Sequence, residues 1–307
     1  MKYVNMTLSE YVYHWLMTYK KTTVKAPTYN RLIGALTTLK EYNISNVLIS
    51  EIYPQHIQEY LNQLVDDGYS ISTIKKQMCI VTAPLKHAAS EGIIPRDPTV
   101  TIKLPRQDTV THQPRDVSAY TSDEQARLRE ALKTIPPYKA ALIEVLLETG
   151  MRVGEALALE WGDINWLRKS ISIRKTIVNP MNKGKSYVQN GAKSKTSNRT
   201  IPMSTRCCEV LQTLKNNNSH FVFIDPAGVR MSYRNLMVTM KTVCKLAEIE
   251  YRGMHVLRHT FATNCYYRGC DVKILSKLLG HADVAITYNT YIHLYGDALE
   301  EMRKVIG

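Results

Sequence analysis

An irregular, proline-containing stretch separates two regions of regular hydrophobic periodicity in this chain. Residues 97–115 hold three prolines among polar side chains and show no sustained helical or strand period. Such composition is typical of a linker. We therefore predict two domains, residues 1–107 and residues 108–307, and a length of 307 residues agrees with that number.

The first region has the hydrophobic spacing of four short helices. Thr7 and Glu10 form a reciprocal capping pattern before the first of them. Pro84 lies inside the fourth pattern, and we expect it to bend or split that helix because proline lacks the amide donor and crowds the preceding turn. The helices are expected to begin at Thr7, at Pro27, at Pro54 (ending near Gly68) and near Ser72 (ending near Gly92).

The second region mixes helices with a small β-sheet, so the predicted fold class is mainly α with a small antiparallel sheet. Thr121 and Glu124 form a second capping pattern. Two β-branched stretches are separated by a polar, glycine-containing loop, which indicates strands joined as a long hairpin. The expected elements are a helix from Thr121, a buried helix over 138–149, strands over 170–178 and 200–203, and helices from Met254 onward with Gly269 and Gly280 as terminators.

Composition limits the partners and the location. The formal net charge is +13 and the pI is near 9.4, which favours a polyanionic partner. No apolar run approaches the ~20 residues of a membrane span, and the N-terminus lacks a signal-peptide pattern. We therefore expect a cytoplasmic protein with no membrane partner. Six scattered cysteines without a CxxC pair indicate neither a zinc site nor a disulfide framework.

A basic segment is the first candidate site. Between Asn165 and Arg206 there is no Asp or Glu, while lysines and arginines recur throughout. On a hairpin, such a run suits the phosphate backbone of DNA, and the alternative is a solvated loop. The DNA-contacting residues predicted here are Lys175, Lys183, Lys185, Lys193 and Arg199.

A second candidate site lies in the string MHVLRHTFAT. His255, Arg258 and His259 stand at i, i+3 and i+4 of a predicted helix start, so they share one face. Two histidines four apart suggest zinc, but no Glu follows the first His and no third ligand is near. An arginine between them favours an anion, since its planar fork matches two phosphate oxygens.

Two further strings complete the pattern. ETGMRVGEALAL places Arg152 just before an apolar helical stretch, and LLGH places His281 after a helix expected to end at Gly280, in an exposed turn. Tyr291 follows ten positions later in NTYIHL. Taken singly, these residues are better explained as a surface arginine and a half-buried packing tyrosine.

Taken in order, these strings resemble the tyrosine recombinase or phage integrase family, of the type found in Gram-positive phages and conjugative transposons. The family signature is an Arg in T-G-x-R-x-x-E, a hairpin Lys, H-x-x-R, a His after L-G, and a nucleophilic Tyr. Lys193 competes with Lys195 for the hairpin position, and the first 107 residues resemble the family's helical, SAM-like core-binding domain. The matching residues are Arg152, Lys195, His255, Arg258, His281 and Tyr291.

The resemblance implies a site-specific recombinase that needs no metal or nucleotide cofactor. Tyr291 would attack the phosphodiester and form a 3′-phosphotyrosyl bond, and His255 would accept its proton. Lys195 would protonate the leaving 5′-hydroxyl, and His259 would orient the motif. The remaining roles, binding of the non-bridging oxygens, fall to Arg152, Arg258 and His281.

The resemblance also implies partners. They are double-stranded DNA attachment or core sites and a homotetramer formed on that DNA, with an accessory directionality factor left open. The apolar residues of the tail beyond Tyr291 suit docking on a neighbouring subunit or on the same domain. Many family members carry an additional arm-binding domain before the core-binding region, and this sequence begins almost at the core-binding helix.

Four other functions compete with integration of a mobile element. They are Xer-like dimer resolution, DNA relaxation by a type IB topoisomerase, DNA binding without catalysis on the same fold, and a basic helical scaffold. Competent residues at all six chemical positions argue against the idle binder and the scaffold.

Overall fold

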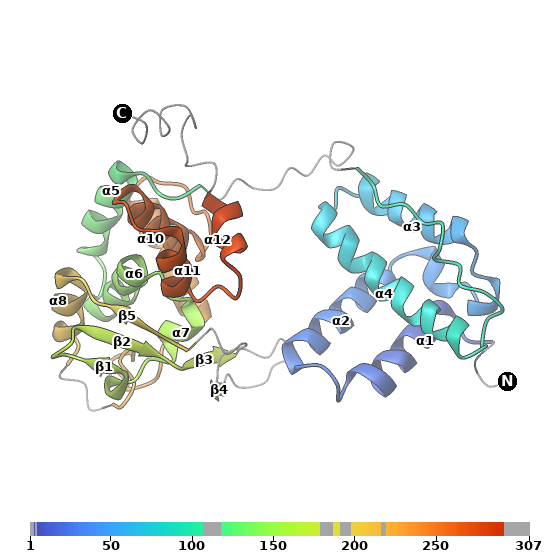
Figure 1. The fold of residues 1–307 in the computed structure, drawn as a ribbon, viewed down its shortest axis with the longest axis horizontal. Helices are drawn as coiled ribbons and strands as arrows, with labels where there is room; N and C mark the ends of the chain where they lie inside the picture. The colour runs from blue at the N-terminus through green and yellow to red at the C-terminus, as the bar shows by residue number, and fades with distance from the viewer. Residues whose placement is uncertain are drawn as a thin grey trace. The chain divides into compact units, whose positions relative to one another are not determined.

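The structure is a computed structural model in which the chain forms two compact units. Among the described residues, those up to 106 belong to one unit and those from 118 onward to the other (Figure 1). The described residues are 3, 5–106, 118–178, 187–190, 198–215 and 219–291.

The first unit is entirely helical, with one apolar core enclosed by its helices. The predicted capping box opens α1: the Glu10 amide donates to Thr7 Oγ1 (3.3 Å), and the Thr7 amide donates to Glu10 Oε2 (2.9 Å). The elements are α1 (Leu8–Trp15), the π-helical turn η1 (Leu16–Lys20), α2 (Ala26–Leu39), the 3₁₀ turns η2 (Asn43–Asn46) and η3 (Ile49–Glu51), α3 (Pro54–Asp66) and α4 (Ile71–Ser90).

The expected split at Pro84 is wrong, because α4 runs without interruption from Ile71 to Ser90, while the expected bend stays a prediction. Pro84 is buried, and Val81 and Leu85 beside it have no exposed surface. Proline removes one hydrogen bond from the helix, whereas the burial of this apolar face stabilises the whole element. Tertiary packing therefore outweighs the local preference.

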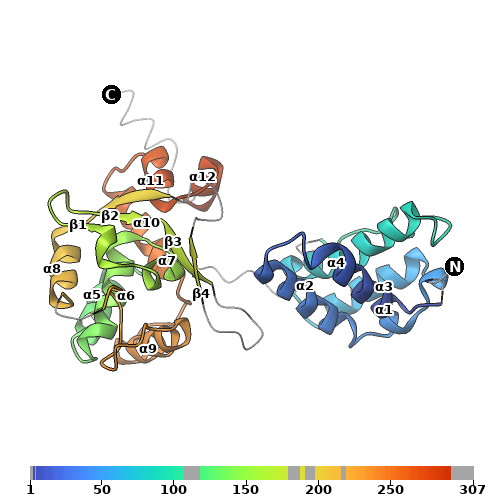
Figure 2. The same ribbon diagram turned by 90° about the horizontal axis from the view of Figure 1, so that it is seen from below.

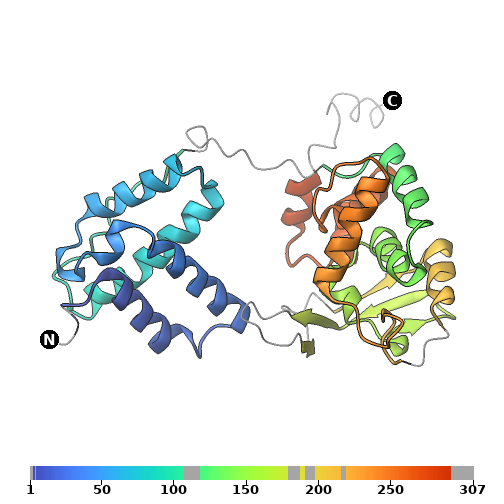
Figure 3. The ribbon, with the colours of Figure 1, turned by 180° about the vertical axis from the view of Figure 1, so that it is seen from behind.

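The second unit is built around α6, whose central residues are buried on all sides. This helix packs against α7, α8, α9 and α10. α9 covers one side of the unit, and α10, α11 and α12 lie together on the other (Figures 2 and 3). The helices are α5 (Ser122–Leu132), α6 (Pro137–Thr149), α7 (Val153–Leu157), the 3₁₀ turn η5 (Trp161–Asp163), α8 (Thr205–Thr213), α9 (Tyr233–Leu246), α10 (Val256–Tyr267), α11 (Val272–Leu279) and α12 (Val284–Tyr291).

The β-structure forms two small antiparallel sheets. The stretch expected to be one strand over 170–178 is divided at Arg174 into β2 and β3, which pair with different partners. Ile171 pairs with Ile201 in a three-stranded sheet of order β1-β2-β5, and β3 pairs with β4 in a second sheet. The strands are β1 (Ile164–Asn165), β2 (Ser170–Ile173), β3 (Lys175–Val178), β4 (Tyr187–Asn190) and β5 (Arg199–Pro202).

The predicted fold class is confirmed: helices dominate and the sheets are small and antiparallel. The two units have separate apolar cores that share no residue. Within the described parts of the chain, no helix has the length and apolar character needed to cross a membrane.

Candidate active site

The site is built around the junction between α6 and α7. Gly150 ends α6 with φ of +61°, and a Cβ there would lie 2.3 Å from Cδ1 of Phe261, so only glycine fits without displacement of that ring. The chain then turns into α7, with Arg152 at its N-cap. The glycine thus brings Arg152 back over the end of α6.

Arg152 is held at both ends of its guanidinium. Nη1 donates to Glu155 Oε1 (2.9 Å), and Nη2 donates to the Gly280 carbonyl (3.1 Å). The side chain keeps 38% of its surface exposed. A phosphate can therefore approach it from solvent.

Arg258 lies on the first turns of α10 and is almost fully buried. Its Nη1 donates to the Gly150 carbonyl (3.0 Å), and its Nη2 donates to the Leu279 carbonyl (2.6 Å). His255 occupies the N-cap position of α10, as the sequence predicts, and its ring lies edge-on to that of His259 at 5.4 Å between centroids. The three residues therefore share one side of the helix start.

His281 follows α11, which ends at Gly280 in the left-handed conformation. The side chain is half-buried rather than in a fully exposed turn, because its Nδ1 is hydrogen-bonded to Thr287 Oγ1 at 2.7 Å. Thr287 is fully buried on α12, the helix that ends at Tyr291. One hydrogen bond thus joins His281 to the helix that carries the predicted nucleophile.

The electrostatics show that these groups act on one another. Burial, followed by the charges of Arg258 and Arg152, lowers the pKa of His281 to about 4. Burial, then the charges of His259, Arg258 and Arg152, lowers the pKa of His255 to about 4, although the residue keeps an exposed surface. Both imidazoles are therefore neutral at pH 7, and each has one ring nitrogen able to accept and one able to donate.

Four of the six predicted catalytic residues are thus gathered in one place from three parts of the chain. Arg152 comes from the start of α7, His255 and Arg258 from the start of α10, and His281 from the turn after α11. The remaining predicted residues Lys183, Lys185, Lys193 and Lys195, and the Tyr291 side chain, lie outside what the structure describes.

Two residues predicted to contact DNA have carboxylate partners within the protein instead. Arg199 is 5% exposed, and its Nη2 pairs with Glu155 Oε2 at 2.7 Å. Lys175 pairs with Glu160 and lies 3.8 Å from Asp163 Oδ2. Arg199 is thus buried and paired with an acidic residue from outside the basic segment, and its contact with DNA stays a prediction.

Glu155 is not among the site residues that we predicted from the sequence. Burial alone would raise its pKa, but the hydrogen bonds and charges of Arg199 and Arg152 outweigh burial and lower it. The sequence signal that could have revealed Glu155 is the R-x-x-E string, in which it stands three positions after Arg152. Its carboxylate also accepts a hydrogen bond from the Arg152 amide at 2.9 Å. A carboxylate there holds two guanidiniums without facing the substrate.

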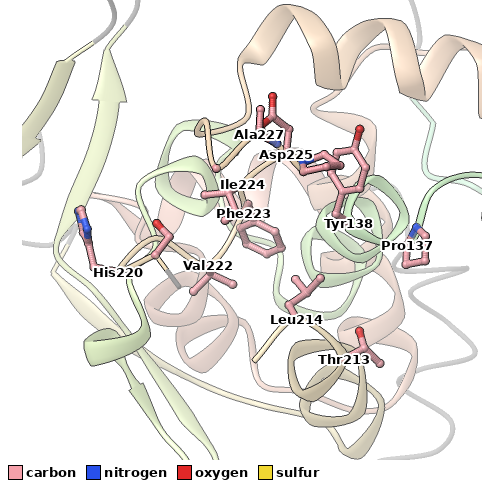
Figure 4. Close-up of a pocket in the computed structure, with 13 residues that line it drawn as sticks. Pro137, Tyr138, Thr213, Leu214, His220, Val222, Phe223, Ile224, Asp225 and Ala227 are labelled. Atoms are coloured by element: carbon pink, nitrogen blue, oxygen red, sulfur yellow. Dashed lines mark hydrogen bonds between the residues drawn. The ribbon is translucent and has the colours of Figure 1, made fainter. Parts of the chain in front are cut away.

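A pocket of about 830 Å³ in the second unit is lined by different residues. It lies between the start of α6, the end of α8 and the loop over 219–228, with Tyr138, Leu214 and Phe223 among its walls (Figure 4). None of the predicted catalytic residues contributes to it. In the described ranges, no group of three or more His, Cys, Asp or Glu side chains is arranged to hold a metal ion.

The arrangement suits chemistry on a phosphodiester. Two guanidiniums offer fixed positive charge, and two neutral imidazoles offer hydrogen bonding and proton transfer. A five-coordinate phosphorus concentrates negative charge on its non-bridging oxygens, so preorganised cations stabilise it more than the ground state.

Comparison with known proteins identifies the class. The Phage integrase family model matches residues 119–297, and the Phage integrase SAM-like domain model matches residues 7–104. Because the first match alone spans more than half of the chain, the chain belongs to the phage integrase family, the tyrosine recombinases, which are site-specific enzymes acting through a covalent tyrosine intermediate. The predicted family and enzyme class are confirmed.

Similar proteins include both Xer recombinases and integrases. A XerC-like tyrosine recombinase of Caldanaerobacter subterraneus subsp. tengcongensis is 27% identical over 94% of this chain and 80% of its own length. XerD of Vibrio cholerae serotype O1 is 24% identical over 81% of this chain and 79% of its own. Both relatives are thus matched over most of their length.

Solved structures show the same fold. The Tn1549 transposon integrase bound to a circular intermediate DNA superposes with a TM-score of 0.84 at 18% identity, over 98% of this chain and 100% of that one. A lambda integrase tetramer bound to a Holliday junction gives 0.70 at 18% identity, over 93% and 77%.

Proposed function

We propose that this recombinase is the integrase of a mobile element, integrating and excising it at defined attachment sites. The proposal is supported by the structural match to the Tn1549 integrase along the whole length of both chains. The first unit would act as the core-binding domain, and the second as the catalytic domain. Substrate DNA would be gripped by both, and a homotetramer would form on it, as the lambda integrase does on a Holliday junction.

The proposed catalytic roles follow from the geometry. Arg152 and Arg258 bind the non-bridging oxygens of the scissile phosphate, and His281 adds a hydrogen bond. The free Tyr291 phenol has an ordinary pKa near ~10, so it needs a proton acceptor, and neutral His255 serves as one. The negative charge of the bound phosphate offsets the guanidinium charges beside His255, and this raises the basicity of His255 when DNA is present.

The cleavage step exchanges the phosphodiester bond of the DNA for a phosphotyrosyl bond, which conserves the energy for religation. Tyr291 Oη forms a bond to phosphorus, the bond to the 5′-oxygen breaks, and Lys195 supplies the proton to that leaving oxygen. The 3′-phosphotyrosyl bond is then attacked by the 5′-hydroxyl of another strand, so no nucleotide is consumed. The observation that carries the proposal is the convergence of Arg152, His255, Arg258 and His281 from separate segments.

A suicide substrate tests this proposal. A nicked duplex that carries the junction sequence flanking the coding region should trap a covalent protein–DNA adduct, seen as a shifted band on a denaturing gel. The adduct should be absent with Tyr291→Phe, while DNA binding by that variant is unchanged. An adduct that persists in Tyr291→Phe would refute the assigned nucleophile.

Dimer resolution remains a second candidate because the curated relatives quoted above carry the names XerC-like and XerD. The two functions differ in their sites. An integrase joins two different sites on separate molecules, whereas a resolvase of dimers acts on two copies of one site. A plasmid assay with matched and unmatched site pairs distinguishes them.

A further inference from the structure

Three consecutive backbone carbonyls at the end of α11 each accept a hydrogen bond from a different arginine. The carbonyls are those of residues 278–280, and the donors are Arg199 Nε (2.6 Å), Arg258 Nη2 (2.6 Å) and Arg152 Nη2 (3.1 Å). The last carbonyls of a helix lack intrahelical partners and carry its negative partial charge. The end of α11 therefore holds together three cationic groups that the sequence places far apart.

Arg199 binds a buried carboxylate through both of its Nη atoms, whereas Arg152 binds it through Nη1 alone and Arg258 donates its Nη atoms to backbone carbonyls. While Nε donates to Leu278, Nη1 and Nη2 donate to the two oxygens of Glu155 at 3.0 and 2.7 Å. The side chain is only 5% exposed. It could reach a DNA phosphate only by leaving a buried carboxylate, and that costs several kcal/mol.

The contacts of Arg199 lead to both sides of the active site. The carboxylate that it holds also binds the side chain and the amide of Arg152. Its Cδ and Nη1 pack against Gly280 so closely that a Cβ there would lie 3.1 Å from each. Gly280 is the residue directly before His281, so one side chain controls the position of two groups expected on the phosphate.

We propose that Arg199 is a positioning residue of the strand-transfer centre. It fixes Glu155 and the end of α11, and through them it orients Arg152 and His281. The inference rests on the proposed function, because it assumes that these two residues meet the scissile phosphate. It replaces the surface contact with DNA that the basic segment suggested for Arg199.

The test separates cleavage from DNA binding. Arg199→Gln removes the charge and the fork, and Arg199→Lys keeps the charge with a single donor group. We expect Arg199→Gln to slow adduct formation at saturating DNA by about 100-fold, the scale of a small misplacement of catalytic groups. Arg199→Lys should recover part of this loss, to about tenfold below wild type.

Arg252→Gln is the matched control. Arg252 pairs with Glu124 at 2.6 Å in the same unit and is 18% exposed, and its ion pairs with Glu124 and Glu250 involve no residue of the centre. This variant should lose thermal stability and keep its cleavage rate when assayed below its melting temperature. If Arg199 had a purely structural role, Arg199→Gln and Arg252→Gln would both lose thermal stability and keep their cleavage rates.

DNA affinity supplies the third readout. Fluorescence anisotropy over a series of salt concentrations should give the same Kd, within about threefold, and the same salt dependence for wild type and both Arg199 variants. A weaker Kd with a salt slope reduced by about 1 would show instead that Arg199 neutralises a phosphate. That result overturns the proposal.

The outcomes distinguish the two proposals. If wild type forms no adduct through Tyr291, the proposed function fails. If wild type reacts and Arg199→Gln reacts at the same rate at saturating DNA, only the positioning role fails. Should Arg199→Gln not fold, wild-type cleavage by folded Arg199→Lys would overturn the requirement for the planar fork.

Discussion

Charge counted along the chain differs from charge paired in space. Lys175 and Arg199 lie in a segment without acidic residues, yet both meet carboxylates contributed by other segments. Arg206, at the edge of that segment, pairs with the buried Glu144. A basic run therefore indicates how much positive charge is available, and only the fold shows which of those charges remain for DNA.

The histidines of the site should make the protein sensitive to acid. The pKa of His281 is lowered from 6.5 to about 4, so the folded protein binds fewer protons than the unfolded chain between these values. The stabilisation is complete above pH 6.5 and is lost as the pH falls toward 4. Urea unfolding at pH 7, 5.5 and 4.5 should show this fall, and His281→Gln should show less of it.

Imidazole resonances in NMR spectra supply the direct check. The His281 and His255 rings should titrate near pH 4 in the free protein. Arg152→Gln should raise both pKa values because it removes one of the nearby positive charges. Titration of either ring near pH 6.5 in wild type would contradict the burial and charge described for the site.

At the scale of elements, one side-chain hydrogen bond links the turn after α11 to α12. His281 Nδ1 meets Thr287 Oγ1, and for His281 to donate from Nε2 to a phosphate as a neutral ring, the threonine hydroxyl must donate to Nδ1. Thr287 therefore selects the tautomer and holds α12 against the turn after α11.

Thr287→Val should slow adduct formation by about fivefold, since a hydrogen bond of this kind contributes about 1 kcal/mol. Thr287→Ser keeps the hydroxyl and should restore most of the rate. Thr239→Val serves as the control, because it changes a buried threonine whose hydroxyl donates to the Asn235 carbonyl within α9. Equal rates for the Thr287→Val variant and wild type would exclude a role for this bond.

Much of the element pattern could be predicted from local signals. The capping boxes at Thr7 and Thr121 and the left-handed terminators at Gly269 and Gly280 involve neighbours in sequence, so the sequence alone reveals them. Pro84 was misjudged because its effect depends on burial against other helices. Long-range packing has no local signature.

The residues of the site could be predicted from the sequence more fully than the hydrogen bonds and ion pairs that connect them. His255 and Arg258 share a helix face by spacing alone, and the family order of the motifs brought in Arg152 and His281. The role of Glu155 depends on its distance to Arg199, 44 positions away, and no periodicity reports such a pairing. For the same reason Arg199 was assigned to the surface.

At the scale of the whole molecule, the two units have cores that share no residue. We therefore expect residues 1–106 and residues 118–307 to fold when produced separately, each with a cooperative thermal transition. The second fragment should still form the Tyr291 adduct on a suicide duplex, with a weaker Kd because half of the grip on DNA is missing. An unfolded second fragment would show that the units depend on one another.

The three arginines that donate to the carbonyls at the end of α11 also constrain how relatives of this protein can vary in length. One residue added within α11 would rotate its last turn by about 100° and displace every carbonyl from its donor at once. Insertions and deletions should therefore be absent between positions 272 and 281 in active relatives. Length changes should occur in loops whose backbone carbonyls accept no hydrogen bond from an arginine.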